Sequence, residues 1–219
     1  MLKFEKLNTK GKVWISSDIH YNHKNICRGV TNWRTEDGKI PFSRVRDFDT
    51  LEQMNNKIVN NINERVGQDD TFIILGDIAF GGHENIAIFL DRLICKDIHL
   101  VYGNHDQNIK KNRENIQSKF SSVNHCLEIT IEDYNFVMFH FPIMTWHGLQ
   151  KGVIHLYGHV HSPKHKRFSP GKSMDVGLDG NDLKPYDLMG EIIPMMEKRK
   201  IDSSFDEDHH LEKLNGLIG

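Results

Sequence analysis

Cysteine is scarce in this sequence, with three residues in 219, at Cys27, Cys95 and Cys126, and no C-x-x-C spacing. An odd number of cysteines cannot pair fully, and the missing spacing argues against a zinc–thiolate site. None of the three lies in the polar clusters described below, so a thiol nucleophile is not expected. We expect reduced thiols in a reducing compartment, which predicts a cytoplasmic protein.

Long apolar runs and an excess of one charge are also missing. No apolar stretch approaches the roughly 20 residues that span a bilayer, and residues 1–11 lack a signal-peptide core, so no membrane association is expected. The formal net charge is only -2, which gives no global attraction to nucleic acid. An apolar fraction of 38% with 26% charged residues is typical of a domain with a sizeable core.

Histidine, by contrast, is abundant, with 14 residues. Many of these histidines lie in polar clusters that follow short apolar runs rich in β-branched and aromatic residues, which predict buried strands. The predicted strands are 13–15, 71–75, 98–102, 136–139 and 153–157, and the clusters are 18–20, 76–77, 103–106, His140 and 158–161.

The segments between the first three strands have helical periodicity, at 48–62, 86–94 and 109–120. This alternation predicts an α/β core with functional loops at the carboxyl ends of the strands. After residue 121 the pattern becomes β-rich, with a predicted hairpin turn at 132–135, so that half is expected to be antiparallel or mixed.

Two segments lack this pattern. Residues 28–47 have little periodicity and predict a long loop over the site, which could carry Arg34, Arg44 or Arg46 toward an anionic substrate. A solvated loop is the alternative. Residues 196–219 are highly charged, and we expect them to form a tail, either a docked helix or frayed, after a domain at 1–195.

The clusters supply an unusual number of metal-binding side chains. In an extended segment, residues two apart point the same way, so Asp18 with His20, and His159 with His161, can each face one ion. An ionised Asp77 after five apolar residues would be costly unless it were paired or metal-bound. Each cluster alone has a simpler explanation, such as a helix N-cap or a tight turn. The candidate ligands are Asp18, His20, Asp77, Asn104, His140, His159 and His161.

Seven such ligands are too many for one ion and suit two ions that share a bridging carboxylate. A two-metal site indicates hydrolytic phosphoryl transfer. His105 beside Asp106 has the composition of an acid–base pair, which would serve the same chemistry.

The order of these motifs resembles the calcineurin-like metallophosphoesterase superfamily. D-x-H, G-D, G-N-H-D, H-x-P and G-H-x-H follow one another between residues 18 and 161. The resemblance implies a four-layer αββα sandwich with two mixed β-sheets and a dinuclear metal site at the strand carboxyl ends. It implies that Asp18, His20 and His161 bind the first metal, with Asp77 bridging, and that Asn104, His140 and His159 complete the second. His105 would be the catalytic histidine beside the leaving group, oriented by Asp106.

The activity implied by the resemblance is hydrolysis of a phosphodiester or phosphomonoester by a metal-bridging hydroxide, with no covalent enzyme intermediate. Nitrogen and oxygen ligands suit two divalent ions, Mn²⁺ first and Fe or Zn²⁺ as alternatives. A phosphoester is the expected partner, and no protein partner is predicted.

Departures from relatives narrow the substrate class. Two positions differ from the motifs of protein Ser/Thr phosphatases. Asp77 is followed by Ile78-Ala79-Phe80, and the fourth residue of the G-N-H-D motif is Asp106. The chain lacks room for the added regions of double-strand-break nucleases, and it is similar to small bacterial and phage phosphoesterases. We therefore expect a small or nucleotide-like substrate, with a nuclease or a non-catalytic scaffold as alternatives. The residues expected to contact it are His23, Asn104 and His105.

Overall fold

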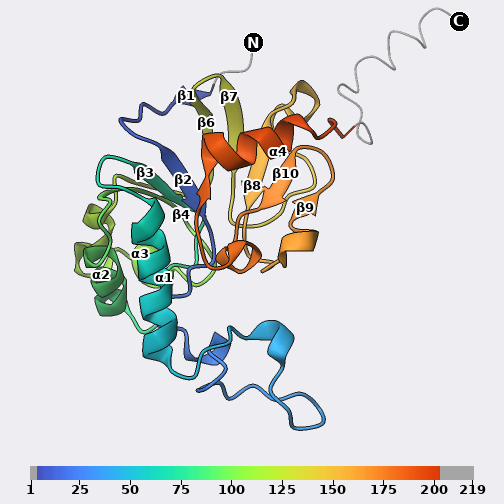
Figure 1. Cartoon of the computed structure of the whole chain (residues 1–219). Helices are drawn as coiled ribbons and strands as arrows, with labels where there is room; N and C mark the ends of the chain where they lie inside the picture. The colour runs from blue at the N-terminus through green and yellow to red at the C-terminus, as the bar shows by residue number, and fades with distance from the viewer. Residues whose placement is uncertain (1–3, 203–219) are drawn as a thin grey trace, which may run out of the picture.

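A computed structural model describes residues 4–202, in which two mixed β-sheets pack against each other and helices flank them (Figure 1). This arrangement confirms the expected α/β class. The five-stranded sheet has the order β11 (Tyr186–Asp187), β2 (Val13–Ser16), β3 (Thr71–Ile74), β4 (Asp97–Val101) and β5 (Ser122–Asn124). The six-stranded sheet has the order β1 (Glu5–Lys6), β6 (Leu127–Ile131), β7 (Tyr134–Met138), β8 (Ile154–Tyr157), β10 (Ser173–Asp175) and β9 (Phe168–Ser169).

The five-stranded sheet brings three of the predicted clusters to one edge. Strands β2, β3, β4 and β5 are parallel, and Ser16 pairs with Ile74, which in turn pairs with Leu100. Because the carboxyl ends of parallel strands meet at one edge, the loops after β2, β3 and β4 are neighbours. Only β11 runs antiparallel, beside β2.

The six-stranded sheet confirms the predicted mixed second half. Strands β6 and β7 form an antiparallel hairpin, while β7, β8 and β10 are parallel. The loops after β7 and β8 therefore leave their sheet at a common edge, where the Gly158 amide donates to the His140 carbonyl at 2.9 Å. A parallel bridge between Ser17 and Gly177 joins this edge to the end of β2.

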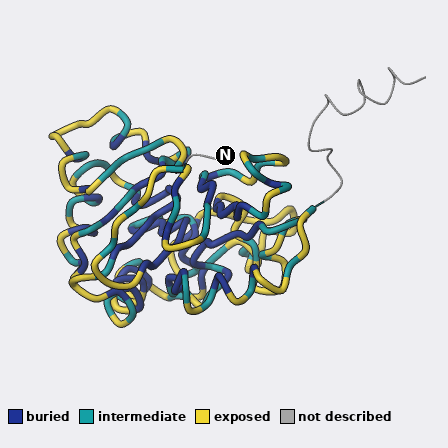
Figure 2. Tube along the Cα trace, turned by 90° about the horizontal axis from the view of Figure 1, so that it is seen from above, coloured by how far each residue is buried: buried dark blue, intermediate teal, exposed yellow. Residues whose placement is uncertain are grey.

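Two apolar cores hold these layers together, and buried segments run through the middle of the molecule (Figure 2). Along β2, Val13 and Ile15 face the core between the sheets, whereas Trp14 faces the core under the helices. That alternation follows from the two-residue period of a strand. Both faces of the central strands are therefore buried.

Helices cover the outer face of the five-stranded sheet. The predicted helix at 48–62 forms α1 (Leu51–Arg65), which starts with a capping box between Thr50 and Gln53 and buries Met54, Ile58 and Ile62. The other helices are α2 (His83–Asp91), α3 (Gln107–Lys110) and α4 (Ile193–Glu197), with a π-helix at Leu188–Ile192 and 3-10 helices at Lys24–Ile26, Phe42–Arg44, Arg113–Lys119, Leu149–Lys151, Lys164–Lys166 and Leu178–Asn181.

The predicted helix at 109–120 is only partly right. A four-residue helix, α3, ends at Lys110, and left-handed backbone at Asn112, Glu114 and Asn115 separates it from the helical residues that follow. Each left-handed residue breaks the hydrogen-bond ladder of a right-handed helix. The buried residues Ile109 and Ile116 still face the core, so the apolar pattern holds although the helix does not.

Residues 28–47, called the arm from here on, form the predicted long loop. The arm protrudes beyond the sheets (Figure 1), and its one regular element is the 3-10 helix at Phe42–Arg44. Its base is closed by Arg28, whose guanidinium pairs with Asp47 and Asp49, and by the Arg46 amide, which donates to the Ile26 carbonyl at 2.6 Å.

The expected domain boundary at residue 195 falls inside α4, whose Met196 is fully buried. Arg199 then donates to the carbonyls of Ser169 and Gly171. The rest of the expected tail, from residue 203, lies outside the described residues. Within 4–202, no helix is long and apolar enough to cross a membrane. The three cysteines are free, as predicted.

Candidate metal centre

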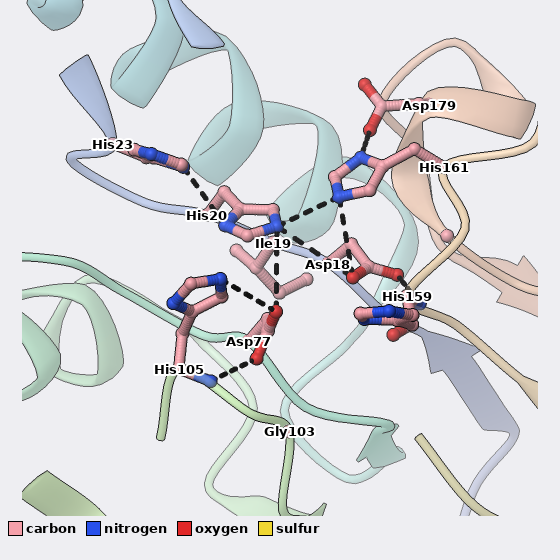
Figure 3. Close-up of polar contacts among 12 residues, drawn as sticks. Asp18, Ile19, His20, His23, Asp77, Gly103, His105, His159, His161 and Asp179 are labelled. Carbon is pink, nitrogen blue, oxygen red and sulfur yellow. Dashed lines mark hydrogen bonds and ion pairs between the residues drawn. The ribbon is translucent and has the colours of Figure 1, made fainter. Parts of the chain in front are cut away.

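All seven predicted ligands lie at the common edge of the two sheets, although they come from five separate loops. Figure 3 shows five of them, namely Asp18, His20, Asp77, His159 and His161. Asp18 and His20 follow β2, Asp77 follows β3 and Asn104 follows β4. His140 follows β7, and His159 and His161 follow β8. Two sets have ligand atoms within 4.8 Å of one another, namely Asp18 with His20 and His161, and Asp18 with Asp77 and His140.

The first set surrounds the Oδ1 atom of Asp18. His20 Nε2 lies 3.8 Å from this oxygen and His161 Nε2 lies 3.7 Å from it, while the two ring nitrogens are 3.1 Å apart. Asp18 and His20 are almost fully buried, and burial raises the pKa of Asp18 to about 6 and lowers that of His20 well below its usual value. Both pKa shifts have the same cause, because burial away from water favours the neutral form of the Asp18 carboxyl group and of the His20 ring.

The second set surrounds Asn104. Its Oδ1 atom lies 2.9 Å from His140 Nε2 and 3.0 Å from His159 Nδ1. Asp77 joins the two sets, because its Oδ2 atom is 3.6 Å from His140 Nε2 and 3.9 Å from His20 Nε2. Its other oxygen, Oδ1, accepts a hydrogen bond from the His105 amide at 2.8 Å. Asp77 therefore occupies the central position expected of a bridging carboxylate.

The donor set fits cations rather than internal hydrogen bonds. His140 Nδ1 lies 2.7 Å from the Leu75 carbonyl, which can only accept, so this nitrogen carries a proton and Nε2 is the ring nitrogen directed into the centre. Nε2 lies 2.9 Å from the Asn104 Oδ1 atom. Asp18 Oδ1 is buried and has no hydrogen-bond partner among the described residues. Oxygen and nitrogen atoms that converge in this way are suited to binding a cation.

The backbone is strained at most of these ligands. Asp18, His20, Asp77, His159 and His161 all have positive φ, between 49° and 73°. Such a conformation is uncommon for residues other than glycine and costs about 1 kcal/mol or more at each position. Strain persists only where the surrounding structure imposes it, and here it aims five ligand side chains into one space.

Glycines let the ligand loops approach each other closely. A Cβ atom on Gly158 would stand 1.8 Å from Ser17 Oγ and 2.5 Å from Asp18 Oδ2, and one on Gly76 would stand 2.8 Å from His140 Nδ1. Both distances to ligand side chains are shorter than van der Waals contact. The glycines that precede Asp77 and His159 are therefore required by the packing of the centre.

Asp106 has a different role from the predicted one. Its Oδ2 atom accepts hydrogen bonds from the amides of Asp77 at 2.9 Å and Gly103 at 2.7 Å, and its Oδ1 atom accepts from Ile78 at 3.1 Å. The predicted contact with the ring of His105 is not among the hydrogen bonds of the described residues. The His105 ring instead lies 3.9 Å from Asp77 through Nε2. A buried carboxylate needs hydrogen-bond donors, and these backbone amides supply them. Asp106 therefore joins the loop after β3 to the loop after β4.

The support of His161 comes from Asp179. Asp179 accepts at 2.6 Å from His161 Nδ1, which leaves Nε2 directed at Asp18 and His20 (Figure 3). Arg46 in turn donates to both carboxylate oxygens of Asp179, at 2.8 and 3.1 Å. Although burial opposes it, the Arg46 charge holds the pKa of Asp179 well below its usual range. Asp179 is thus a partner of a candidate ligand.

Arg46 does not face the substrate side as considered from the sequence. Its guanidinium is 5% exposed and also donates to the carbonyls of Asp18 and Ile19, both at 2.7 Å. Five hydrogen-bond donors in a rigid plane suit such a position, where several oxygens must be satisfied at once. Arg46 therefore fixes the loop after β2 and the loop after β10 together.

An aromatic group lies on the open side of the centre. His23 stacks on Phe80 with ring centroids 3.7 Å apart, and His105 lies 4.8 Å from the same ring. His23 Nδ1 is also 3.3 Å from His20 Nδ1. Burial, followed by the neighbouring His105 charge, lowers the pKa of His23 to about 4. The sequence analysis did not predict a role for Phe80. Its position three residues after Asp77 is the one sequence feature that could have indicated a place near the site.

Two mixed sheets with clustered Asp, Asn and His side chains at their shared edge define an α/β protein with a candidate metal-binding site. The profile of the calcineurin-like phosphoesterase family matches residues 11–191, and the chain belongs to that family.

Relatives support the same assignment without naming a substrate. An uncharacterized protein of Methanocaldococcus jannaschii is 27% identical over 87% of this chain and 94% of its own length. The gene 66 protein of Mycobacterium phage D29 is 25% identical over 85% of this chain and 98% of its own length. The crystal structure of a protein of unknown function from Aquifex aeolicus has a similar fold, with a TM-score of 0.59 at 20% identity, over 84% of this chain and 98% of that chain.

Proposed function

We propose that this protein is a metal-dependent phosphoesterase that hydrolyses a phosphodiester or phosphomonoester of a small or nucleotide-like molecule. Asp18, His20 and His161 hold one divalent ion, Asp77 is shared, and Asn104, His140 and His159 hold the second. Mn²⁺ is the first choice for this set of oxygen and nitrogen ligands, with Fe or Zn²⁺ as alternatives. When bound, two such ions supply Lewis acidity that activates water and neutralises phosphate charge.

One observation carries this proposal. Asp18 Oδ1 is buried with no hydrogen-bond partner among residues 4–202, and the ring nitrogen His140 Nε2 converges on Asn104 Oδ1 at 2.9 Å. Carboxylate and amide oxygens and imidazole nitrogens that converge in this way are the ligands that a divalent cation binds. The arrangement supports metal binding independently of sequence motifs.

His105 is the proposed catalytic residue. Its side chain is 46% exposed, whereas those of Asp77 and His140 are 3% and 0% exposed, so its ring faces the substrate side. Asp77 Oδ2 lies 3.9 Å from His105 Nε2. A protonated His105 would donate its proton to the departing oxygen of the ester. His23 and Asn104 are the further residues that we propose to contact the phosphate.

The test is hydrolysis of aryl phosphodiesters with Mn²⁺, measured beside metal binding by titration calorimetry. We expect turnover that a chelator abolishes and about two ions bound per chain. The His105→Ala variant should keep its metal affinity and lose about 100-fold or more in kcat, because general acid catalysis contributes about that much. Asp77→Asn should lose both properties.

The leaving group tests the role of His105. A phenyl diester, whose leaving group is the stronger base, should lose more rate in His105→Ala than a p-nitrophenyl diester, because the poorer leaving group needs the proton more. His147→Ala, a histidine that pairs with Glu128, is the matched control and should behave as wild type. Stoichiometric metal binding without turnover of any phosphoester would refute the proposed function.

A further inference from the structure

A pocket opens beside the first ligand set, between the arm and the loops that follow β8 and β10. Its volume of about 810 Å³ falls within the range of small-molecule sites, roughly 300–1,000 Å³. His161 and Asp179 line it, so the pocket and the candidate metal centre share residues. A molecule held by its phosphate at that centre would have the pocket directly beside it.

The lining of this pocket combines apolar walls with an accessible indole. Ile26, Val160 and Leu183 contribute apolar surface. Trp33 is 37% exposed and Val160 is 47% exposed, so neither is covered by the protein itself. The centroids of the Trp33 and His23 rings are 6.3 Å apart, and the two rings meet edge-on. The indole N–H of Trp33 makes no hydrogen bond with other residues in the described part of the chain. An accessible indole offers a face for stacking.

Two charged side chains that line the pocket have no partner among the described residues. Arg44 and Asp182 make no side-chain hydrogen bond or ion pair with other described residues, whereas Arg46 is held by Asp179 and Asp47 by Arg28. A guanidinium binds phosphate oxygens, and a carboxylate accepts hydrogen bonds from hydroxyl or amino groups. The pocket therefore offers a stacking surface, a cation and an acceptor together.

We propose that this pocket binds the nucleoside part of a nucleotide phosphoester, with the base stacked on Trp33 and the apolar walls around it. Asp182 accepts from a ribose hydroxyl or an exocyclic amine, and Arg44 contributes positive charge toward the phosphate. The inference rests on the proposed function, because it takes the phosphate to be bound at the metal centre. A purely aliphatic ester would leave the indole face and Asp182 unused.

The experiment compares two ligands that differ only in the base, adenosine 5′-monophosphate and ribose 5-phosphate. Their affinities for the Mn²⁺-loaded protein are measured by calorimetry, and tryptophan fluorescence follows the same titrations. Because stacking of a base on an aromatic side chain contributes strongly to affinity, adenosine 5′-monophosphate should bind about tenfold or more tightly. Trp33→Leu should remove this preference and the fluorescence change, and leave the affinity for ribose 5-phosphate unchanged.

Phe42→Leu is the matched control. Phe42 is 70% exposed on the same arm but does not line the pocket, so its variant should retain the preference for the base. Arg44→Gln should weaken both ligands by a similar factor. Equal affinities of the two ligands for the wild type, or a base preference that survives in Trp33→Leu, would overturn the inference.

Turnover of the aryl phosphodiester, measured in parallel, separates this inference from the proposed function. Turnover without any preference for the base contradicts the pocket assignment alone. A Trp33-dependent preference for the base without turnover supports nucleotide binding and contradicts the hydrolytic function. A preference together with turnover supports both.

Discussion

Replacing Arg46 with methionine tests whether one buried guanidinium organises the candidate metal centre. In the native protein this group donates to the carbonyls of Asp18 and Ile19 and to both carboxylate oxygens of Asp179, at distances of 2.7 to 3.1 Å. The methionine side chain fills similar space but donates nothing. Arg46→Met therefore leaves two carbonyls and one carboxylate without their donor.

Breaking a buried ion pair by removing one partner costs about 3–5 kcal/mol. The Asp179 side chain is 22% exposed and keeps its hydrogen bond to His161, so we expect the lower end, about 3 kcal/mol. For a chain of this size, that loss lowers Tm by about 6–12 °C. Urea unfolding of the metal-free protein gives the free energy, and scanning calorimetry gives Tm.

Two further variants make the test specific. The double variant Arg46→Met/Asp179→Leu removes both charges, so it should be more stable than Arg46→Met alone, because no uncompensated carboxylate remains. Arg44→Met, on the same arm but without side-chain partners among residues 4–202, should change stability by no more than about 0.5 kcal/mol. A loss below about 1 kcal/mol in Arg46→Met, or strict additivity in the double variant, would refute this reasoning.

Four other outcomes follow from the structure. Asp179→Asn weakens the support of His161 and should lower Mn²⁺ affinity in calorimetry by about 10- to 100-fold; an unchanged affinity would contradict that role. Gly158→Ala places a methyl group 1.8 Å from Ser17 Oγ, so it should impair metal binding, and a variant with native affinity would disprove the close packing. Asn104→Ala should reduce the bound ions from about two to one per chain while circular dichroism stays native; retention of both ions would exclude Asn104 as a ligand. Burial lowers the pKa of His155 to about 4, so the unfolded chain takes up this proton first and stability falls as the pH drops from 6.5 through 4. Protonation of His155 in the unfolded chain lowers the free energy of unfolding by about 3 kcal/mol over this pH range. In His155→Gln the free energy of unfolding should therefore depend less steeply on pH, and the same slope in variant and wild type would contradict this prediction.

Local pattern was sufficient for much of the fold. Strand and helix periodicities depend on neighbouring residues, so β2, β3, β4 and α1 were predicted close to their observed positions. The 109–120 segment shows the limit of this approach, because its apolar spacing is compatible with left-handed turns as well as with a continuous helix. The apolar spacing predicted which residues are buried. The backbone conformation between those residues could not be read from that spacing.

The partners of the site residues could not be predicted in the same way. Arg46 and Asp179 are 133 residues apart, and nothing near either residue in the sequence indicates that they pair. Asp106 stands next to His105 in the chain, which suggested a contact, yet adjacent side chains in a turn point in different directions. Its carboxylate binds amides from another loop instead.

The sequence by itself determined the candidate ligands, the strand ends that carry them and the family of the protein, because those features lie within a few residues of each motif. Only the tertiary structure decided that Arg46 is committed to Asp179, that Asp106 ties two loops together and that the arm encloses a pocket beside the metal centre. These features depend on contacts between distant segments, whose geometry is fixed by the packing of two sheets and not by local periodicity.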